Sequence, residues 1–593
     1  MLSRPPHHHN AAERPETAPL FRAEEALSRG ATAEALDWYW QAVLIAPDDP
    51  TALRGLAQGL LATGKVGEAA ATALSALDQA PRDEACLQLL ARIAQRVKAA
   101  PAGVAIPGVP SSRALLAVLA SERVCHQDFA MLILSALKST VLAGVLPLLR
   151  KQGARAATAW LLAPPGRPTM EDPLLLAYLA RTINLDPELE TLLTALRRKV
   201  LLERLWRRDG VSPAMLAALA QQCINNEYVF HAEPDEEAAA QALAAEIEER
   251  IRARRKLGLE VLALACYQPP WRLAGFATLG KAPQVTDPHA RRLVAKLAAD
   301  WADESRGRKT VATLTPIGDG VSAAVAQQYE ENPYPRWLSL TPPVSGSLVP
   351  AAMAERDLRV LVAGCGTGLH SVMAALGYGP RAQVLAIDLS RASLAYAQRM
   401  SRRWNLTNLH YAQADILRLE GLEQRFEIIE CCGVLHHMAD PLAGWRVLAG
   451  LLAPGGLMKV ALYSRRARRL VTSARAVITQ RGLGQSDSDI RRFRWDLLNG
   501  RENAGGLAHI AADLYSLSNT RDLLFHVQEH QFTPLGIKEC LDTLGMEFLG
   551  FDPAPAGMVD AGQEKDLAAW DAAEERHPDL FRHMYWFTCR NLD

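Results

Sequence analysis

The sequence predicts an all-α N-terminal half followed by an α/β domain built on a doubly wound parallel sheet. Two observations carry this prediction. Between residues 19 and 325, apolar side chains recur three and four positions apart, which is typical of amphipathic helices. After Gln327, short apolar runs that resemble strands alternate with helix-length segments. This alternation is typical of a parallel sheet covered on both faces.

The composition is that of an ordinary globular protein, since 49% of the 593 residues are hydrophobic and 22% are charged. Lys and Arg together number 65, as do Asp and Glu. No net charge therefore attracts nucleic acid or an anionic membrane, and we expect neither as a partner. The nine cysteines form no C-x-x-C pair, so no zinc cage or disulfide framework is expected.

The expected compartment is the cytoplasm. The longest clean apolar run, Val141 to Leu149, is too short to span a bilayer. The first residues also lack the apolar core of a secretory signal. The sequence leaves the oligomeric state open.

The N-terminal quarter contains an arm and a repeat. Residues 1–18 are rich in Pro, His and Ala without periodicity, and we expect a disordered arm. Residues 19–97 repeat at a spacing of 34, so that Gly30 matches Gly64. Small residues at fixed places and a closing proline at this period resemble tetratricopeptide repeats. The alternative is a generic alanine-rich helical bundle.

A linker and a helical middle domain follow the repeat. Residues 98–112 contain three prolines and two glycines and are expected to be a linker. Residues 113–325 have a helical pattern without a catalytic motif. Within them, residues 225–228 (Asn-Asn-Glu-Tyr) interrupt an apolar stretch. This tetrapeptide lines a substrate pocket or forms the polar end of a helix, and the sequence leaves both interpretations open.

The C-terminal domain is expected to span residues 326–593. Its strands are separated by segments long enough for helices, so the early strands should pair in parallel. The expected strands are 359–364, 383–390, 408–415, 426–434, 455–464, Gly545 to Asp552 and His583 to Cys589.

The strongest functional motif follows the first expected strand. Gly364, Gly366 and Gly368 form a G-x-G-x-G sequence that opens a helix. Glycines allow a tight turn and let a ligand lie against bare backbone. The spacing differs from the G-x-G-x-x-G of dinucleotide-binding enzymes. It resembles motif I of the class I S-adenosylmethionine-dependent methyltransferases.

The later motifs of that family follow in order. Asp388 ends the second strand, where an acid can accept hydrogen bonds from both ribose hydroxyls; the alternative role, a helix N-cap, fits Ser390 better. Asp415 ends the third strand. In the family this acid meets the adenine amino group, and the next residue, here Ile416, packs on the ring. The alternative for Asp415 is an ordinary loop acid. The resemblance covers residues 355–464 closely.

The resemblance implies a Rossmann-like sheet whose last two strands close antiparallel, and S-adenosylmethionine as the cofactor. Many members of the family have an acid at the position of Val362, where it helps to hold the methionine ammonium. Its absence leaves the amino-acid end to other residues, among which we expect Tyr329, Tyr334 or Arg336. The predicted cofactor-binding residues are Tyr329, Arg336, Gly364, Cys365, Gly366, Gly368, Asp388, Leu389, Asp415 and Ile416.

The chain resembles a bacterial group of these methyltransferases that is fused to tetratricopeptide repeats. The segment YEENPYPRW before the first strand and the later RDLLFHVQEHQFT contribute to this resemblance. Between the fifth strand and a helix near Pro534, residues 465–532 are expected to form a helical lid. Its basic run, from Arg465 to Arg481, meets an acidic substrate or forms a solvated helix face.

The lid also supplies candidate catalytic residues. On a helix, Asp522, His526 and His530 would share one face, with Glu529 nearby. We rank a substrate-site network first, a structural network second and a metal site third, and we expect no metal. His437, just after the fourth strand, is a candidate base or a packing residue. The predicted catalytic residues are His437, His526, His530 and Tyr334.

The sequence therefore predicts an S-adenosylmethionine-dependent methyltransferase. Because grooves of helical repeats commonly bind peptides, we expect a peptide or protein acceptor recruited by the repeats. The alternatives are a small-molecule acceptor, and a non-catalytic protein that binds the cofactor as a sensor.

Overall fold

The computed structural model describes most of the chain. The described residues are 18–99, 105–208, 210–280, 284–318, 320–502, 506–507, 512–582 and 584–592. The expected disordered arm lies outside them except for its last position, and so do residues 100–104 of the expected linker. The chain divides into two compact units. The first is Met1–Thr182 with Leu338–Thr341, and the second is Ile183–Trp337 with Pro342–Asp593.

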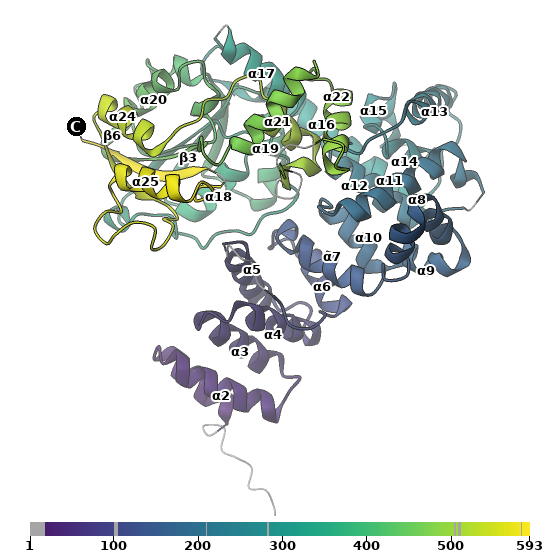
Figure 1. Cartoon of the computed structure of the whole chain (residues 1–593), viewed down its shortest axis with the longest axis horizontal. Coiled ribbons are helices and arrows are strands. Elements are labelled where there is room, and N and C mark those ends of the chain that lie inside the picture. The colour runs from purple at the N-terminus through teal and green to yellow at the C-terminus, as the bar shows by residue number, and fades with distance from the viewer. Residues whose placement is uncertain are drawn as a thin grey trace, which may run out of the picture. The chain divides into compact units, whose positions relative to one another are not determined.

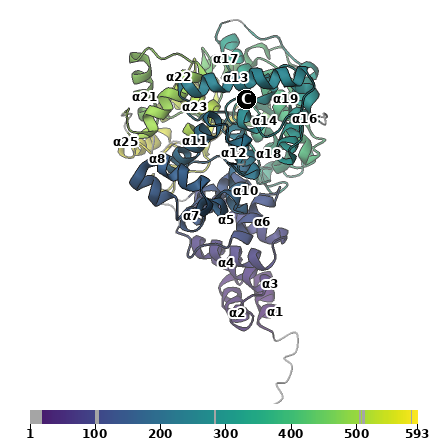
Figure 2. The same ribbon diagram turned by 90° about the vertical axis from the view of Figure 1, so that its right-hand side faces the viewer.

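The first unit is helical throughout its described secondary structure. Its α-helices are α1 (Pro19–Ser28), α2 (Thr32–Ile45), α3 (Pro50–Ala62), α4 (Val66–Gln79), α5 (Glu84–Ala99), α6 (Ser112–Ala120), α7 (Ala130–Ser139), α8 (Leu146–Leu162), α9 (Arg167–Glu171) and α10 (Pro173–Arg181). From α1 to α5, each helix packs against the next, as Figure 2 shows for α1 to α4.

The first helices recur with the spacing that the sequence shows. Helices α2 and α4 begin 34 residues apart, at Thr32 and Val66. Gly30 and Gly64, which precede them, have φ angles of 76° and 81°. This left-handed conformation favours glycine. Identity as tetratricopeptide repeats remains a proposal.

The second unit begins with helices that precede a sheet. They are α11 (Pro187–Leu202), α12 (Pro213–Asn225), α13 (Pro234–Arg252), α14 (Glu260–Ala265), α15 (Phe276–Leu279), α16 (Pro288–Thr310) and α17 (Val321–Glu331). Three of them start in the same way: the side chains of Asp186, Ser212 and Asp287 each accept a backbone N–H of the first turn, and a proline follows. Such caps fix where a helix begins.

The sheet has eight strands in the order β1-β4-β3-β2-β5-β6-β8-β7. They are β1 (Ala312–Thr313), β2 (Leu358–Ala363), β3 (Ala382–Asp388), β4 (Leu409–Gln413), β5 (Phe426–Cys432), β6 (Leu452–Leu462), β7 (Met546–Phe551) and β8 (Tyr585–Asn591). Strands β1 to β6 pair in parallel, and β8 lies antiparallel between β6 and β7. The expected doubly wound sheet and its antiparallel closure are confirmed.

Helices cover the sheet on both faces. They are α18 (Leu369–Tyr378), α19 (Arg391–Ser401), α20 (Pro441–Ala449), α24 (Pro534–Leu544) and α25 (Leu567–Arg576), and Figure 1 labels them around β3 and β6. Alternate residues of β2 enter opposite cores. Leu361 packs in a core with Trp445 and Trp570, whereas Val360 packs in another with Tyr378. Burial on both faces explains why this strand is a continuous apolar run.

A helical insertion joins β6 to α24. It contains α21 (Arg469–Gln480), α22 (Asp487–Leu498) and α23 (Leu517–Phe525). No helix in the described part of the chain is both long and apolar enough to cross a membrane.

Candidate active site

The glycine-rich turn lies between β2 and α18, at the carboxyl ends of the parallel strands. Gly364, Gly366 and Gly368 have φ angles of 74°, 51° and 85°. A Cβ atom on Gly364 would lie 2.3 Å from the Val434 side chain, and one on Gly366 would lie 2.6 Å from the Tyr334 carbonyl oxygen. Both the backbone conformation and the available space therefore require glycine.

Hydrogen bonds hold the segment from Pro335 to Trp337 against this turn. The Trp337 indole N–H donates to the Thr367 carbonyl at 2.9 Å, and the Thr367 hydroxyl donates to the Pro335 carbonyl. The Tyr396 hydroxyl of α19 donates to the Trp337 carbonyl at 2.7 Å. These bonds hold the aromatic segment over the expected cofactor turn.

Asp388 ends β3 beside this turn. One carboxylate oxygen accepts the Gly366 N–H at 2.8 Å, and the other accepts the Ser390 N–H at 2.9 Å. Burial raises the pKa of Asp388 to about 6. Each oxygen has a second lone pair, which is free to accept a ligand hydroxyl. The side chain thus shapes the turn and retains capacity for the predicted ribose contact.

Asp415 is held more fully by the chain itself. Its two carboxylate oxygens accept the N–H groups of Leu417 at 3.0 Å and Gly318 at 2.9 Å. Its own N–H donates to the Thr315 hydroxyl at 2.8 Å. The neighbouring Ile416 is buried. Asp415 therefore has the contacts of a cap, and its predicted contact with adenine stays a prediction.

A polar cluster lies between the aromatic segment and the insertion. The Tyr329 hydroxyl donates to an Asp522 carboxylate oxygen at 2.8 Å and lies 3.1 Å from Nε2 of His526. His526 Nδ1 accepts the Gln528 N–H at 3.1 Å. The hydrogen of neutral His526 is therefore on Nε2. Hydrogen bonds thus run from His526 to Tyr329 and on to Asp522.

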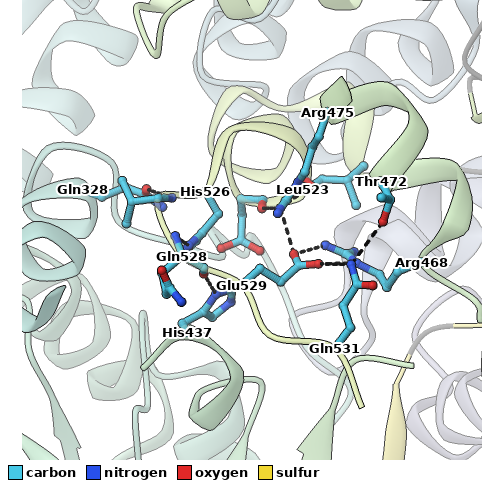
Figure 3. Close-up of polar contacts among 12 residues, drawn as sticks. Gln328, His437, Arg468, Thr472, Arg475, Leu523, His526, Gln528, Glu529 and Gln531 are labelled. Atoms are coloured by element: carbon cyan, nitrogen blue, oxygen red, sulfur yellow. Dashed lines mark hydrogen bonds and ion pairs between the residues drawn. The ribbon is translucent and has the colours of Figure 1, made fainter. Parts of the chain in front are cut away.

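His437 stacks on this cluster. Its ring lies 3.7 Å from the His526 ring, with an angle of 22° between the ring planes. Nδ1 of His437 donates to the Gln528 carbonyl at 2.7 Å, a contact drawn in Figure 3. Nε2 of His437 is therefore the nitrogen with a lone pair. Burial lowers the pKa of both histidines to about 4, so both are neutral near pH 7.

The cluster does not have the form of a metal site. Possible ligand atoms of His437, Asp522 and His526 lie within 4.8 Å of one another. An imidazole binds a metal through a lone pair in its ring plane, about 2 Å from nitrogen. Two nearly parallel rings stacked face to face cannot both direct that lone pair at one nearby ion. A hydrogen-bonded network fits the geometry better.

The predicted helical face that joins Asp522, His526 and His530 is wrong in part. Helix α23 ends at Phe525, and His526 has an extended ψ of 138°. Asp522 and His526 still meet, because they span the last helical turn. The chain then extends across the ends of β5 and β6, where the His530 N–H donates to the His436 carbonyl at 2.7 Å. This backbone pairing overrides the helical spacing that the sequence suggested.

The basic run of the insertion is paired internally. Glu529 accepts from Arg468 and Arg475, as Figure 3 shows. Arg466 pairs with Asp571, Glu574 and Glu575, and Arg469 pairs with Asp579. These ion pairs neutralise much of the run. A role in meeting an acidic substrate is therefore weakly supported, and a structural role is favoured.

Sequence reasoning missed two aromatic side chains beside the cluster. The fully buried His436 ring stacks on Tyr463 at 4.0 Å, and the Arg468 guanidinium covers the Tyr463 ring at 3.8 Å. His436 adjoins His437 in sequence, which was an available signal. Tyr463 lies at the end of an apolar strand, where nothing in the sequence marks it.

Residues 360–456 match the profile of a methyltransferase domain family. The C-terminal part of the chain is a class I S-adenosylmethionine-dependent methyltransferase domain. Its sheet order, glycine turn and Asp388 agree with this assignment.

The chain is similar to several curated proteins, and one of the two described here is a methyltransferase. A ubiquinone biosynthesis O-methyltransferase of Xanthomonas campestris is 36% identical over 125 residues, which are 21% of this chain and 50% of the relative. A protein of Synechococcus is 28% identical over 270 residues, which are 41% of this chain and 63% of the relative. The chain thus spans less than two thirds of the length of these relatives.

Solved structures with a related fold include methyltransferases. PKMT2 from Rickettsia typhi in complex with AdoHcy is 17% identical, with a TM-score of 0.32, covering 40% of this chain and 50% of that one. Magnesium protoporphyrin IX methyltransferase from Synechocystis with bound SAH is 14% identical, with a TM-score of 0.23, covering 49% of this chain and 95% of that one.

S-adenosylmethionine is the cofactor of the methyltransferase domain, and the residues present fit it. Asp388 fits the ribose, because its carboxylate oxygens keep lone pairs that can accept the ribose hydroxyls. Leu389 directly follows Asp388, and Cys365 lies within the glycine turn. Their predicted contacts, like those of Tyr329 and Arg336, stay predictions.

Replacing Asp388 with Ala should weaken cofactor binding by about 2 kcal/mol, because charge-assisted hydrogen bonds to the ribose are lost. The Gly366 and Ser390 N–H groups also lose their acceptor. Calorimetric titration with S-adenosylhomocysteine tests this. Unchanged affinity would remove Asp388 from the cofactor site.

Acidification should destabilise the folded methyltransferase domain through its buried histidines. The unfolded chain protonates His437 and His526 below their ordinary pKa of 6.5, whereas burial holds the folded pKa at about 4. Stability is thus present above the ordinary pKa and is lost as pH falls toward the folded value. We expect a loss of roughly 1–2 kcal/mol per histidine between about pH 7 and pH 5. Urea unfolding of the wild type and His437→Gln should show a smaller loss in the variant.

Proposed function

We propose that this chain is an S-adenosylmethionine-dependent methyltransferase with a peptide or protein acceptor. The observation that carries the catalytic part is the meeting of two sites at one edge of the sheet. The cofactor turn and the cluster of Tyr329, His437, Asp522 and His526 are joined through the aromatic segment, whose Tyr334 carbonyl lies over Gly366.

The chemistry requires proximity and little else. The bound cofactor supplies an activated methyl group on a sulfonium. The protein positions the acceptor and excludes water, effects that can account for much of the rate. Tyr329 and Tyr334 stack with ring centroids 6.2 Å apart and form an aromatic wall. Tyrosine faces also attract a cation by about 1 kcal/mol.

His437 is the proposed proton acceptor. Its Nε2 has the lone pair, and the Gln528 carbonyl holds its Nδ1–H. Because burial holds its pKa at about 4, His437 is neutral near pH 7, and its Nε2 can accept a proton that the methyl acceptor releases. His526 orients Tyr329, and Asp522 accepts from Tyr329. Tyr334 completes the aromatic wall, whereas His530 contacts the Gln528 amide at 3.0 Å and supports that loop.

The helical repeats support a peptide acceptor. A cavity of about 310 Å³ lies among α1, α2 and α3, with Tyr39, Thr51, Arg54 and Gln58 in its lining. An aromatic ring, a guanidinium and amide or hydroxyl groups suit an extended peptide, whose backbone offers donors and acceptors.

The small-molecule alternative is favoured by the curated relatives. As their name states, ubiquinone biosynthesis O-methyltransferases catalyse O-methyl transfer in the synthesis of a small molecule. If the acceptor is a small molecule, the helical repeats do not recruit it. A cofactor sensor without turnover is the third possibility.

Label transfer from methyl-tritiated S-adenosylmethionine distinguishes these functions. The full chain is incubated with a lysate of cells that lack its gene, and label is followed into proteins and metabolites. Label in protein supports the proposal, label in a metabolite supports the alternative, and binding without label supports the sensor.

The repeat groove can be tested in the same assay. Ser28→Trp should fill the cavity and lower label transfer to protein several-fold, with cofactor affinity unchanged. Ser75→Trp, on the exposed face of α4, is the matched control. Equal label transfer by both variants and the wild type would show that the groove does not recruit the acceptor.

A further inference from the structure

The tetrapeptide at residues 225–228 has a strained backbone. Glu227 and Tyr228 follow α12 with φ angles of 58° and 62°. Two consecutive non-glycine residues in the left-handed region are unfavourable and persist only where surrounding contacts hold them. Here the Asn226 carbonyl accepts the Leu517 N–H at 3.2 Å, and the Tyr228 carbonyl accepts from Arg491 at 2.7 Å. The insertion therefore fixes this turn against the methyltransferase domain.

In this turn, the Glu227 carboxylate lies against the first turn of α23. It accepts the Ser518 hydroxyl at 2.7 Å and the Ser518 N–H at 3.2 Å. Burial raises the pKa of Glu227, and the nearby Arg336 opposes that rise. The side chain is enclosed by protein yet keeps some accessible surface, as do Tyr334 and Asp388.

Glu227 lies beside the proposed active site. Ser518, which holds Glu227, and Asp522, which holds Tyr329, are four residues apart on α23. Residues at this spacing lie on one face of a helix, roughly 6 Å apart. The helical region before the sheet thus places the Glu227 carboxylate against α23, the helix that contains Asp522 of the catalytic cluster.

Three polar groups of this region have no partner among the described residues. Arg336 lies over the Tyr396 ring at 5.3 Å, and among the described residues it has no hydrogen-bond or ion-pair partner. The Asn226 amide nitrogen and the Tyr228 hydroxyl are buried without a partner. Buried polar groups are normally satisfied, so these groups have hydrogen-bonding capacity to offer a ligand.

The cofactor has a part that this set complements. Its methionyl end carries an ammonium and a carboxylate. Strand β2 enters the glycine turn through the buried apolar residues Val362 and Ala363, which offer neither charge. Asp388 is positioned for the ribose, and Asp522 accepts from Tyr329. Glu227 and Arg336 are side chains of opposite charge that interact electrostatically, and an α-amino-acid zwitterion offers an opposite charge to each of them.

We propose that Glu227 and Arg336 bind the methionyl end of the cofactor, with Glu227 on the ammonium and Arg336 on the carboxylate. The helical region before the sheet then completes the cofactor site of the methyltransferase domain. This assignment rests on the proposed function, and it makes the strained turn part of cofactor recognition.

Two ligands separate the methionyl end from the nucleoside. S-adenosylhomocysteine has the amino-acid end, whereas 5′-methylthioadenosine lacks it. Calorimetry on the full chain should show that Glu227→Gln binds S-adenosylhomocysteine roughly 10- to 100-fold more weakly, with little change for 5′-methylthioadenosine. Arg336→Met should behave alike and serves as the second variant if Glu227→Gln does not fold. Glu237→Gln, an exposed acid on α13, is the control.

Each outcome has one meaning. Wild-type affinity for S-adenosylhomocysteine in both variants overturns the proposal, and a loss of turnover in those variants would then place Glu227 and Arg336 at the acceptor. An equal loss for both ligands also overturns it, because the turn would then act only on the shape of the site. Failure of the wild type to bind either ligand refutes the proposed function instead.

Discussion

Replacing His437 with Gln should lower the maximal rate of methyl transfer by roughly 100- to 1,000-fold, while affinity for S-adenosylhomocysteine stays within about twofold. His437 is the histidine whose Nε2 has the free lone pair, since the Gln528 carbonyl takes its Nδ1–H. Glutamine can keep a hydrogen bond to that carbonyl but cannot accept a proton. The rate should therefore fall without loss of the cofactor.

The measurement is the initial rate of label transfer at saturating cofactor, with calorimetry beside it. His410→Ala is the matched control, because His410 is an exposed histidine on β4, within the same sheet. If His437→Gln turns over as fast as this control, His437 only packs on His526, which is the second role that the sequence allowed. A rate that recovers as pH rises would indicate an acceptor that loses its proton without help.

Local patterns were enough to predict the sheet. The central strands β2, β3 and β5 are short, largely apolar runs, and the helix-length segments between strands permit crossover connections. The glycine turn was also predictable, because its conformation and its contacts both depend on the residues in one short motif. Strand β1 was missed because it has only two residues and no apolar run of its own.

The polar cluster depends on long-range contacts and was predicted only in part. Tyr329 and Asp522 are nearly two hundred positions apart, and their hydrogen bond requires the insertion to fold back over the sheet. The sequence named both residues but could not pair them. It placed His530 on a helix, because helical spacing cannot show that backbone pairing with His436 will end the helix first.

The conformation of Glu227 could not be predicted from the sequence either. Its tetrapeptide was noticed because polar residues interrupt an apolar stretch, but the sequence allowed either a pocket or a helix end. The structure shows the helix end, since α12 ends at Asn225 and the next residues turn toward α23, whereas the pocket stays a prediction. Glu and Tyr rarely adopt positive φ angles, so their presence in the sequence gives no reason to expect this conformation.

The other large effect concerns stability. Glu190 on α11 and Arg494 on α22 form a bidentate salt bridge, with both N–O distances at 2.7 Å. Both side chains are buried, at 1% and 0% exposure. Arg494 also donates to the Leu514 carbonyl. The pair therefore joins the helical region to the insertion that carries the catalytic cluster.

Arg494→Met should destabilise the second unit by about 3–5 kcal/mol, because it leaves the Glu190 carboxylate buried without a countercharge. The double variant Glu190→Leu/Arg494→Met should recover most of that loss, since matched apolar side chains replace a buried pair at little cost. Urea unfolding followed by tryptophan fluorescence measures both. Lys538→Met, which breaks an exposed pair with Asp542, should cost less than about 1 kcal/mol. A single variant no less stable than this control would show that α22 is anchored by its apolar face, through Ile490, Phe493 and Leu497, rather than by the ion pair.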